Sequence, residues 1–350
     1  MDCLRSLRWF ARPRERQRGG VIVKVALLVL GLVAAAALGA HWYVNQRPLP
    51  MTSDRIEFRV PAGAGVRAIA QSAQAAGIGV QADAMVVAAR LAGATTNLRA
   101  GRYAVERGIT LAGLLAKLKA GDVLREKVTV VEGITFRELR ALLAAATELK
   151  PESAALSSAE LLKAVGAGEA HPEGLFAPDT YVYDPGTSDL EVLRQAYRRQ
   201  MKLLQDAWDA RAPDLPYRTP YEALIMASIV EKETGQPSER DMIAGVFVNR
   251  LKLGMLLQTD PTVIYGLGEK FDGNLRKRDL QADGPYNSYT RAGLPPTPIA
   301  LPGRASIEAA LNPAKTNALY FVSRGDGTSH FSGSLGEHNR AVDKYQRGAR

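Results

Sequence analysis

The sequence predicts an α+β protein with a single N-terminal transmembrane helix followed by two extramembrane domains. Three observations predict this class: one long apolar segment near the N-terminus, strand patterns that lead into helix patterns after it, and a length of 350 residues, which suits roughly two domains. We expect a cytoplasmic basic arm at 1–24, a transmembrane helix at 25–44, a tether at 45–55, a small α+β subdomain at 56–125 and a mixed α/β domain at 126–345.

The composition is that of a globular protein, with 46% apolar and 23% charged residues. It excludes a disordered tail, a collagen-like chain and a polytopic membrane protein. Cys3 is the only cysteine, which excludes a disulfide within the chain and zinc sites that need two thiolates. Of the net charge of +9, residues 1–24 carry +5, because they hold seven basic and two acidic side chains. The basic balance therefore does not indicate a nucleic-acid partner.

The segment Val25–Val44 has 20 residues without a full charge, the length that a helix needs to cross roughly 30 Å of hydrocarbon. Trp42 and Tyr43 stand at its far end, where amphipathic rings favour the membrane interface. The basic cluster lies on its N-terminal side, which predicts that this end is cytoplasmic and that 45–350 lies outside. The alternative is a cleaved signal peptide, with Ala37-Leu38-Gly39 as the cleavage site.

An alternating strand, a glycine turn and an amphipathic helix recur three times, at 57–74, 102–118 and 127–143. In the second and third copies Thr110 and Thr135 stand where helix N-caps are expected. The first copy contains Gly63-x-Gly65-x-x-Ala68, a weak dinucleotide-binding pattern that we interpret as a structural turn. We expect no cofactor.

A helix that begins after Thr219, with Pro220 at its first position, carries the strongest candidate for chemistry. Leu224, Ala227, Ser228 and Glu231 share one face of this helix by their spacing. Glu231 is thus a carboxyl group on an apolar stripe beside small residues, which leave room for a ligand. Such a setting favours the protonated form that a general acid needs. The alternative is a structural glutamate that pairs with Lys or Arg.

Glu233 lies about 200° around the same helix and should point away from Glu231. The residues Ser238–Asp241 have the spacing of a second capping box. Asp260 precedes a proline, which fixes a turn or extended geometry, and an acid there more often bonds nearby amides than catalyses a reaction.

A long loop at 286–299 combines polar donors, flat aromatic rings and prolines. Tyrosines beside Asn and Gln suit an extended sugar ligand, which offers hydroxyls and apolar ring faces. The chain then predicts a hairpin from strands at 319–322 and 330–332. His330 and His338 have the spacing of no common metal site, so we expect structural roles for them and no metal.

Eight ordered motifs and the N-terminal anchor resemble the YceG-like endolytic murein transglycosylases (the MltG family). The motifs are Glu173-Gly-Leu-Phe-Ala-Pro-Asp-Thr-Tyr181, Ala227-Ser-Ile-Val-Glu-Lys-Glu233, Val246-Phe-Val-Asn-Arg-Leu251, Leu257-Gln-Thr-Asp-Pro-Thr-Val263, Tyr286-Asn-Ser-Tyr289 with Gly293-Leu-Pro-Pro296, Leu319-Tyr-Phe-Val322 and Glu337-His-Asn339. Thr297 departs from the glycine that the family pattern has after the two prolines.

The resemblance implies a LysM-like subdomain at 56–125 and a YceG-like catalytic domain at 126–345, on the outer side of a bacterial inner membrane. It implies cleavage of MurNAc–GlcNAc β-1,4 bonds within nascent glycan strands to give 1,6-anhydro ends, and a role in terminating glycan chain elongation. Glu231 matches the catalytic glutamate, which would act as acid and then as base. Glycan strands and the cytoplasmic membrane are the implied partners, and contact with cell-wall synthases is a hypothesis.

Our candidates for contact with the substrate are Gln258, Asp260, Tyr286, Asn287 and Tyr289. Two alternatives remain open at this point. A hydrolytic muramidase would use Asp260 as a second carboxylate. A non-catalytic peptidoglycan-binding scaffold would make Glu231 structural.

Overall fold

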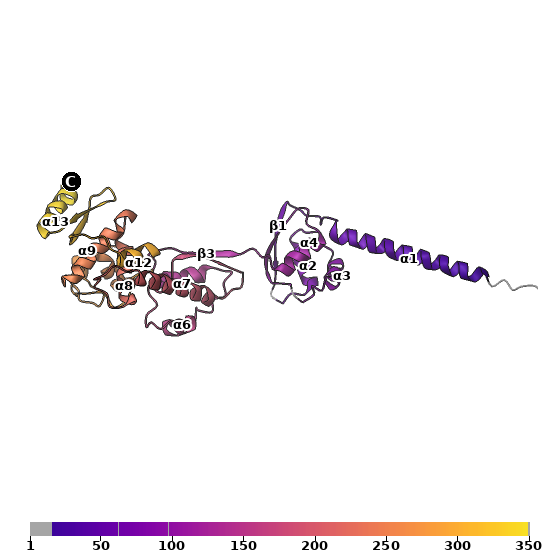
Figure 1. The fold of residues 1–350 in the computed structure, drawn as a ribbon, viewed down its shortest axis with the longest axis horizontal. Helices are drawn as coiled ribbons and strands as arrows, with labels where there is room; N and C mark the ends of the chain where they lie inside the picture. Colours follow the sequence, from indigo (N-terminus) through magenta and orange to yellow (C-terminus); the bar gives the residue numbers. More distant parts are fainter. Residues whose placement is uncertain (1–15, 62, 97, 349–350) are drawn as a thin grey trace, which may run out of the picture. The chain divides into compact units, whose positions relative to one another are not determined.

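The computed structural model describes residues 16–61, 63–96 and 98–348 (Figure 1). The chain divides into two compact units, Met1–Leu124 and Arg125–Arg350, which we call the N-terminal and the C-terminal unit. Each unit has its own cluster of buried apolar side chains.

The first helix, α1 (Arg16–Asn45), contains the predicted membrane span. Its part from Ile22 to Asn45 is 24 residues long and apolar enough to cross a membrane. Large apolar side chains along this part are exposed, as expected of a helix that faces lipid. At the C-terminal end of α1, Tyr43 and Val44 pack against the core of the N-terminal unit.

The N-terminal unit continues with β1 (Arg55–Val60), α2 (Val66–Ala75), α3 (Ala82–Leu91), β2 (Gly101–Glu106) and α4 (Leu111–Ala120). The strands β1 and β2 form an antiparallel pair in which Phe58 stands opposite Tyr103. Alternate residues of β1 are buried, so the period-2 pattern of the sequence turns one face of the pair to the helices.

Residues 45–55, expected to be a tether, are bonded to the N-terminal unit along their backbone. The amide of Leu49 donates to the carbonyl of Ile109 at 2.8 Å, and the amide of Gly79 donates to the carbonyl of Pro50 at 2.7 Å. Met51 forms an isolated bridge with Ile78. The backbone groups of this short segment therefore find partners in neighbouring turns.

The C-terminal unit is mainly helical. Its strands are β3 (Glu126–Val130), β4 (Asp179–Tyr183), β5 (Tyr320–Ser323) and β6 (Ser329–Ser332). Its helices are α5 (Phe136–Ala145), α6 (Ser158–Val165), α7 (Asp189–Asp209), α8 (Pro220–Glu233), α9 (Arg240–Lys252), α10 (Asp260–Leu267), α11 (Lys277–Gln281), α12 (Arg304–Leu311) and α13 (Leu335–Val342), with a π turn at Asp343–Arg347 and single 3₁₀ turns at Pro237–Glu239 and Gly268–Lys270.

The named strands of this unit form two antiparallel pairs, β3–β4 and β5–β6. The fold class is therefore α+β, and the expected mixed α/β character of the second domain is wrong among the described residues. The third strand–helix copy, β3 with α5, belongs to this unit and not to the small one. The predicted hairpin is confirmed as β5–β6.

Helix α8 forms the centre of the C-terminal unit and packs against α7, α9, α10 and α12. Thr219 caps it, accepting from the amide of Glu222 at 3.2 Å, as the sequence predicts. All residues from Ala223 to Val230 are buried, so the helix is enclosed on every side and not on a single stripe. The capping box expected at Ser238 does not form, because a 3₁₀ turn leads directly into α9.

Candidate active site

Glu231 lies in the last turn of α8 and is partly exposed. Its Oε2 accepts a hydrogen bond from the backbone amide of Gly303 at 2.9 Å. The turn after β3 lies against it: a methyl group at Gly133 would come within 3.7 Å of the Glu231 Cγ. Lys232, the next residue, donates to the carbonyl of Gly133 at 3.1 Å. The carboxyl group is thus held between two chain segments far apart in the sequence.

Glu132 is a second carboxylate, and it lies beside Gly303. A Cβ atom at Gly303 would lie 1.8 Å from the Glu132 Oε1, so only a residue without a side chain leaves this carboxylate where it is. Burial raises the pKa of Glu132, the charge of Glu231 raises it further, and Arg240 opposes both. Two carboxyl groups and one backbone amide therefore meet at the end of α8.

The segment 295–303 passes over α8 and is largely buried. Ser228 fixes it there, because its Oγ accepts from the amide of Ile299 at 2.9 Å and donates to the carbonyl of Ile225 at 2.7 Å. The buried amide of Gln200 donates to the carbonyl of Pro302 at 3.1 Å. Ala227 and Ser228 consequently leave no room for a ligand, contrary to the sequence prediction, because this segment fills the space.

The side chains of Glu233 and Glu231 have different hydrogen-bond partners, as the helix spacing predicts. Its Oε1 accepts a short hydrogen bond from the hydroxyl of Thr259. Burial raises the pKa of Glu233, the Thr259 bond lowers it, and the nearby charge of Asp260 raises it. The amide of Thr259 donates to the hydroxyl of Ser288 at 3.0 Å, which joins the end of α8 to the loop at 286–299.

Of the five predicted substrate-binding residues, Gln258, Asp260 and Tyr289 lie around the N-terminal end of α10. Tyr286 instead packs against the last turns of α10, and Asn287 bonds to α11. The amide of Gln258 donates to the carbonyl of Ser288 at 3.1 Å, and the Tyr289 hydroxyl donates to Asp260 Oδ1 at 2.5 Å. Gln258 is exposed and has a φ of +52°, a conformation that non-glycine residues rarely adopt and that concentrates at functional sites. Gln258 and Asp260 are the exposed members of the group.

Asn287 and Tyr286 are engaged inside the protein. The Asn287 side chain is 5% exposed, donates to the carbonyl of Ala282 at 2.7 Å and accepts from the amide of Tyr289 at 2.9 Å. Tyr286 shares a hydrogen bond with Thr297 at 2.9 Å. Thr297, at the position where the resemblance led us to expect glycine, therefore adds a bond to this loop. Both residues hold the loop through these bonds, and their contact with substrate stays a prediction.

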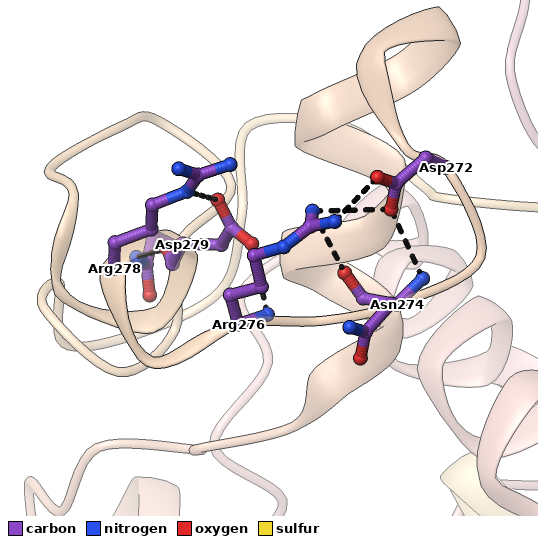
Figure 2. A network of polar contacts seen from close by, with 6 residues as sticks. Asp272, Asn274, Arg276, Arg278 and Asp279 are labelled. Atoms are coloured by element: carbon purple, nitrogen blue, oxygen red, sulfur yellow. Dashed lines mark hydrogen bonds and ion pairs between the residues drawn. The ribbon is translucent and has the colours of Figure 1, made fainter.

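The segment before this loop is closed by local ion pairs (Figure 2). Arg276 reaches back to Asp272, with Nη2 and Oδ2 2.6 Å apart, and the amide of Asn274 donates to Asp272 Oδ1 at 3.2 Å. Asp279 accepts from the amide of Arg276 at 2.8 Å and so begins α11. The Asn287 amide then bonds to carbonyls of this short helix and the residue after it.

A buried acid supports the other side of the loop. Glu173 is 3% exposed; its Oε1 accepts from the amide of Phe136 at 2.8 Å and its Oε2 from the hydroxyl of Tyr265 at 3.0 Å. Burial raises the pKa of Glu173 to about 7, although both hydrogen bonds lower it. The Tyr265 ring contacts the Tyr286 ring, with centroids 4.9 Å apart. Glu173 thus links α5, α10 and the loop.

Sequence analysis missed Glu132 and Gly303. Glu132 stands directly before the Gly-Ile-Thr turn of the third strand–helix copy, where the second copy has Arg107. This change from a basic to an acidic residue between two copies of the repeat was the signal in the sequence for Glu132. It was missed because the repeat was interpreted as structural. Nothing local in the sequence marks Gly303, because its importance arises from contacts with residues 72 and more positions away.

Known proteins are similar to this chain over most of its length. The pattern of the YceG-like family matches residues 58–344. An endolytic murein transglycosylase of Bacillus subtilis is 32% identical over 327 residues, which cover 88% of this chain and 90% of that protein. One of Streptococcus pneumoniae (strain D39) is 27% identical, over 91% of this chain and 64% of the longer streptococcal protein.

A solved structure is also similar. The crystal structure of a yceG-like protein of Listeria monocytogenes has a TM-score of 0.55 and 29% identity, and the match covers 82% of this chain and 98% of that one. Family pattern, relatives and structure agree over most of the chain, including both units. The chain belongs to the YceG-like family.

Proposed function

We propose that this protein is a membrane-anchored endolytic peptidoglycan lytic transglycosylase. It would cleave MurNAc–GlcNAc β-1,4 bonds within nascent glycan strands and leave 1,6-anhydroMurNAc ends, and so terminate chain elongation. The relatives named endolytic murein transglycosylase support the activity. The observation that carries the proposal is Glu231, held at the partly exposed end of the central helix by the amide of Gly303.

In the proposed reaction Glu231 acts first as acid and then as base. It gives its proton to the glycosidic oxygen as the bond from that oxygen to MurNAc C1 breaks. The resulting carboxylate takes the proton from the MurNAc 6-hydroxyl, whose oxygen forms the new bond to C1 of the same ring. No water is consumed, and the nucleophile gains from proximity because it belongs to the substrate. The Gly303 amide stabilises the carboxylate between the two proton transfers.

For the substrate, Gln258 and Asp260 are the proposed direct contacts, because their side chains are exposed. Tyr289 would fix the position of Asp260 through its hydrogen bond. Asn287 and Tyr286 would act indirectly, by holding the loop.

Hydrolysis is the second candidate, and a specific observation favours it. Glu132 and Glu231 are both in contact with Gly303, and hydrolysis requires two carboxyl groups at one site. Asp260, the second carboxylate expected from the sequence, instead interacts with Tyr289 and Glu233. If the enzyme is a hydrolase, Glu132 and not Asp260 is the better candidate for the base.

The masses of the products test the proposal. The full chain in detergent, its Glu231→Gln variant and a Glu308→Gln control would each be incubated with uncross-linked glycan strands. Glu308 is an exposed glutamate of α12 that pairs with Arg304. We expect products one water lighter than hydrolytic fragments from the parent and the control, and none from Glu231→Gln. Binding without cleavage by the parent would support the scaffold alternative.

We further propose that α1 spans the bacterial inner membrane with its N-terminus in the cytoplasm. Cys3, the single cysteine, lies outside the described residues but offers the test. A membrane-impermeant maleimide should label it only after permeabilisation of spheroplasts. Labelling of intact spheroplasts would reverse the orientation, and a chain that lacks residues 1–39 in cells would support signal-peptide cleavage.

Two finer proposals complete the function. The order β1–α2–α3–β2 supports a LysM-like, glycan-binding role for the N-terminal unit. Glycan pull-down by the full chain should weaken when exposed residues of this unit are changed.

The second finer proposal is contact with cell-wall synthases. Failure of any synthase to co-purify with the chain after cross-linking would contradict it.

A further inference from the structure

An apolar groove of about 660 Å³ lies within the N-terminal unit, between the end of α1 and the helices α3 and α4. Ala37, Ala40 and Val44 of α1 form one wall, and Leu91 of α3 and Leu115 of α4 lie opposite. Most of the residues around it are apolar, and none of the described ones is acidic. We call it the α1/α3/α4 groove.

The groove lies at the level of the last two to three turns of the membrane span. At 1.5 Å per residue, the step from Ala37 to Val44 covers roughly 10 Å of a hydrocarbon layer of about 30 Å. If α1 crosses the bilayer from Val25 to Val44, these turns lie in the outer leaflet. Because α3 and α4 face the same turns of α1, their groove-lining side chains lie at that depth too.

Two large apolar side chains of α3 are unusually exposed for a water-soluble surface. Leu91 is 84% exposed and Val87 is 55% exposed. Neither belongs to the buried core of the unit, whereas Met85 and Ala89 of the same helix do. Side chains of this kind next to a membrane helix are typical of a surface that enters the interface.

The charge at the groove is suited to a phospholipid. Lys119 of α4 is the charged side chain among the described residues that line the groove, and it is exposed. A lysine can place its carbon chain along apolar surface while its ammonium group reaches the level of the phosphates. The apolar lining of the groove can hold an acyl chain while the ammonium group at its rim pairs with the phosphate of the same lipid.

We propose that the α1/α3/α4 groove takes an acyl chain of an outer-leaflet phospholipid and docks the N-terminal unit on the bilayer. The occupant is the bilayer itself, because the groove is continuous with the helix that enters it. The inference rests on the membrane span proposed above. It adds that the unit is fixed on the lipid surface, whereas the sequence predicted only a short tether at 45–55.

Fluorescence quenching by acyl-brominated phospholipids tests this. In a Cys3→Ser background, single cysteines would replace Leu91 at the groove, Leu30 in the middle of the span, and Gln71, an exposed residue of α2 away from the groove. Each full-length variant would carry an environment-sensitive dye in phospholipid vesicles. We expect loss of emission at positions 30 and 91 and unchanged emission at 71. The exposure of Leu91 makes misfolding on substitution a small concern.

Each of the other possible results would contradict a different part of the proposal. Quenching at 30 but not at 91 would remove the docking and leave the anchor intact. No quenching at 30 would remove the span and the docking with it. Quenching at 91 that is relieved when a small amount of a long-chain isoprenoid is added would exclude a phospholipid as the preferred occupant. A signal at 91 that depends on protein density in the vesicle would indicate a second copy of the chain. Cleavage of soluble glycan, measured on the same variants, reports separately on Glu231.

Discussion

Glu132 and Glu231 are the residues on which the proposed chemistry most depends, and Gly303 connects them. Two carboxyl groups this close repel each other when both are charged, and this is one cause of the raised pKa of Glu132. A proton held at the site is the resource that an acid-catalysed cleavage needs. The consequences of changing each partner follow from these contacts.

Replacing Glu132 with Gln should change the pH–activity profile, because it removes a carboxyl group whose pKa is raised by burial and by the charge of Glu231. The part of the profile that follows the titration of Glu132 should be lost. The pH dependence of cleavage by Glu132→Gln and by a Glu269→Gln control measures this; Glu269 is an exposed acid that pairs with Arg137. An unchanged profile would show that Glu132 does not act on the catalytic proton, and loss of all activity at every pH would favour a direct role as base.

Replacing Gly303 with Ala should reproduce the effect of removing Glu132. The φ of Gly303 is −76°, which any residue can adopt, so the cost lies in the clash with the Glu132 carboxylate. Since the clashing atom is the end of a flexible side chain, the carboxylate should move and the melting temperature should change little. In a double-mutant cycle, Gly303→Ala should have no further effect on activity once Glu132 is Ala. Additive losses would contradict the proposed link.

At the scale of elements, α8 and the segment 295–303 build the site together. Ser228 joins them by one hydrogen bond in a fully buried setting. Ser228→Ala leaves the Ile299 amide without its acceptor and should destabilise the protein by about 1–3 kcal/mol. Ser306 on α12 provides a matched control, because its equally buried hydroxyl has no hydrogen-bond partner among the described residues. Urea unfolding should show a loss for Ser228→Ala and none for Ser306→Ala; equal losses would contradict this account.

Glu173 makes the junction of α5, α10 and the loop sensitive to pH. Its pKa is about 7 in the folded protein and near 4.5 when solvated, so the folded state binds more protons between these values. Stability should therefore fall as the pH rises through this range, by on the order of 3 kcal/mol for a shift of this size. Glu173→Gln should flatten that part of the profile, whereas Glu191→Gln, on the exposed face of α7, should not. Unfolding midpoints between about pH 4.5 and pH 8 decide this.

Elements with a local signal were predictable, and those made by distant contacts were not. The threonine caps, the membrane span and the β5–β6 hairpin each follow from residues within one segment. The burial of α8 on all sides and the meeting of Glu132 with Glu231 depend on segment 295–303, which carries no pattern that reveals its position. The family motifs pointed to α8 and Glu231, an assignment that stays a prediction, and the second carboxylate came only from the structure.

At the scale of the whole molecule, two units with separate cores divide the proposed tasks. The N-terminal unit holds α1 and the α1/α3/α4 groove, and the C-terminal unit holds Glu231 and the loop at 286–299. Because the 45–55 segment is bonded to the N-terminal unit, that unit lies directly at the C-terminal end of α1. Chemistry and membrane attachment can therefore be tested on the same chain by separate readouts.

Cleavage in ¹⁸O-labelled water tests the central claim most directly. In the proposed reaction the MurNAc 6-hydroxyl closes on C1 of its own ring, so the new ends should contain no heavy oxygen and should have the anhydro mass. Incorporation of one heavy oxygen into each new end, with the mass of a reducing sugar, would contradict lytic cleavage and establish hydrolysis.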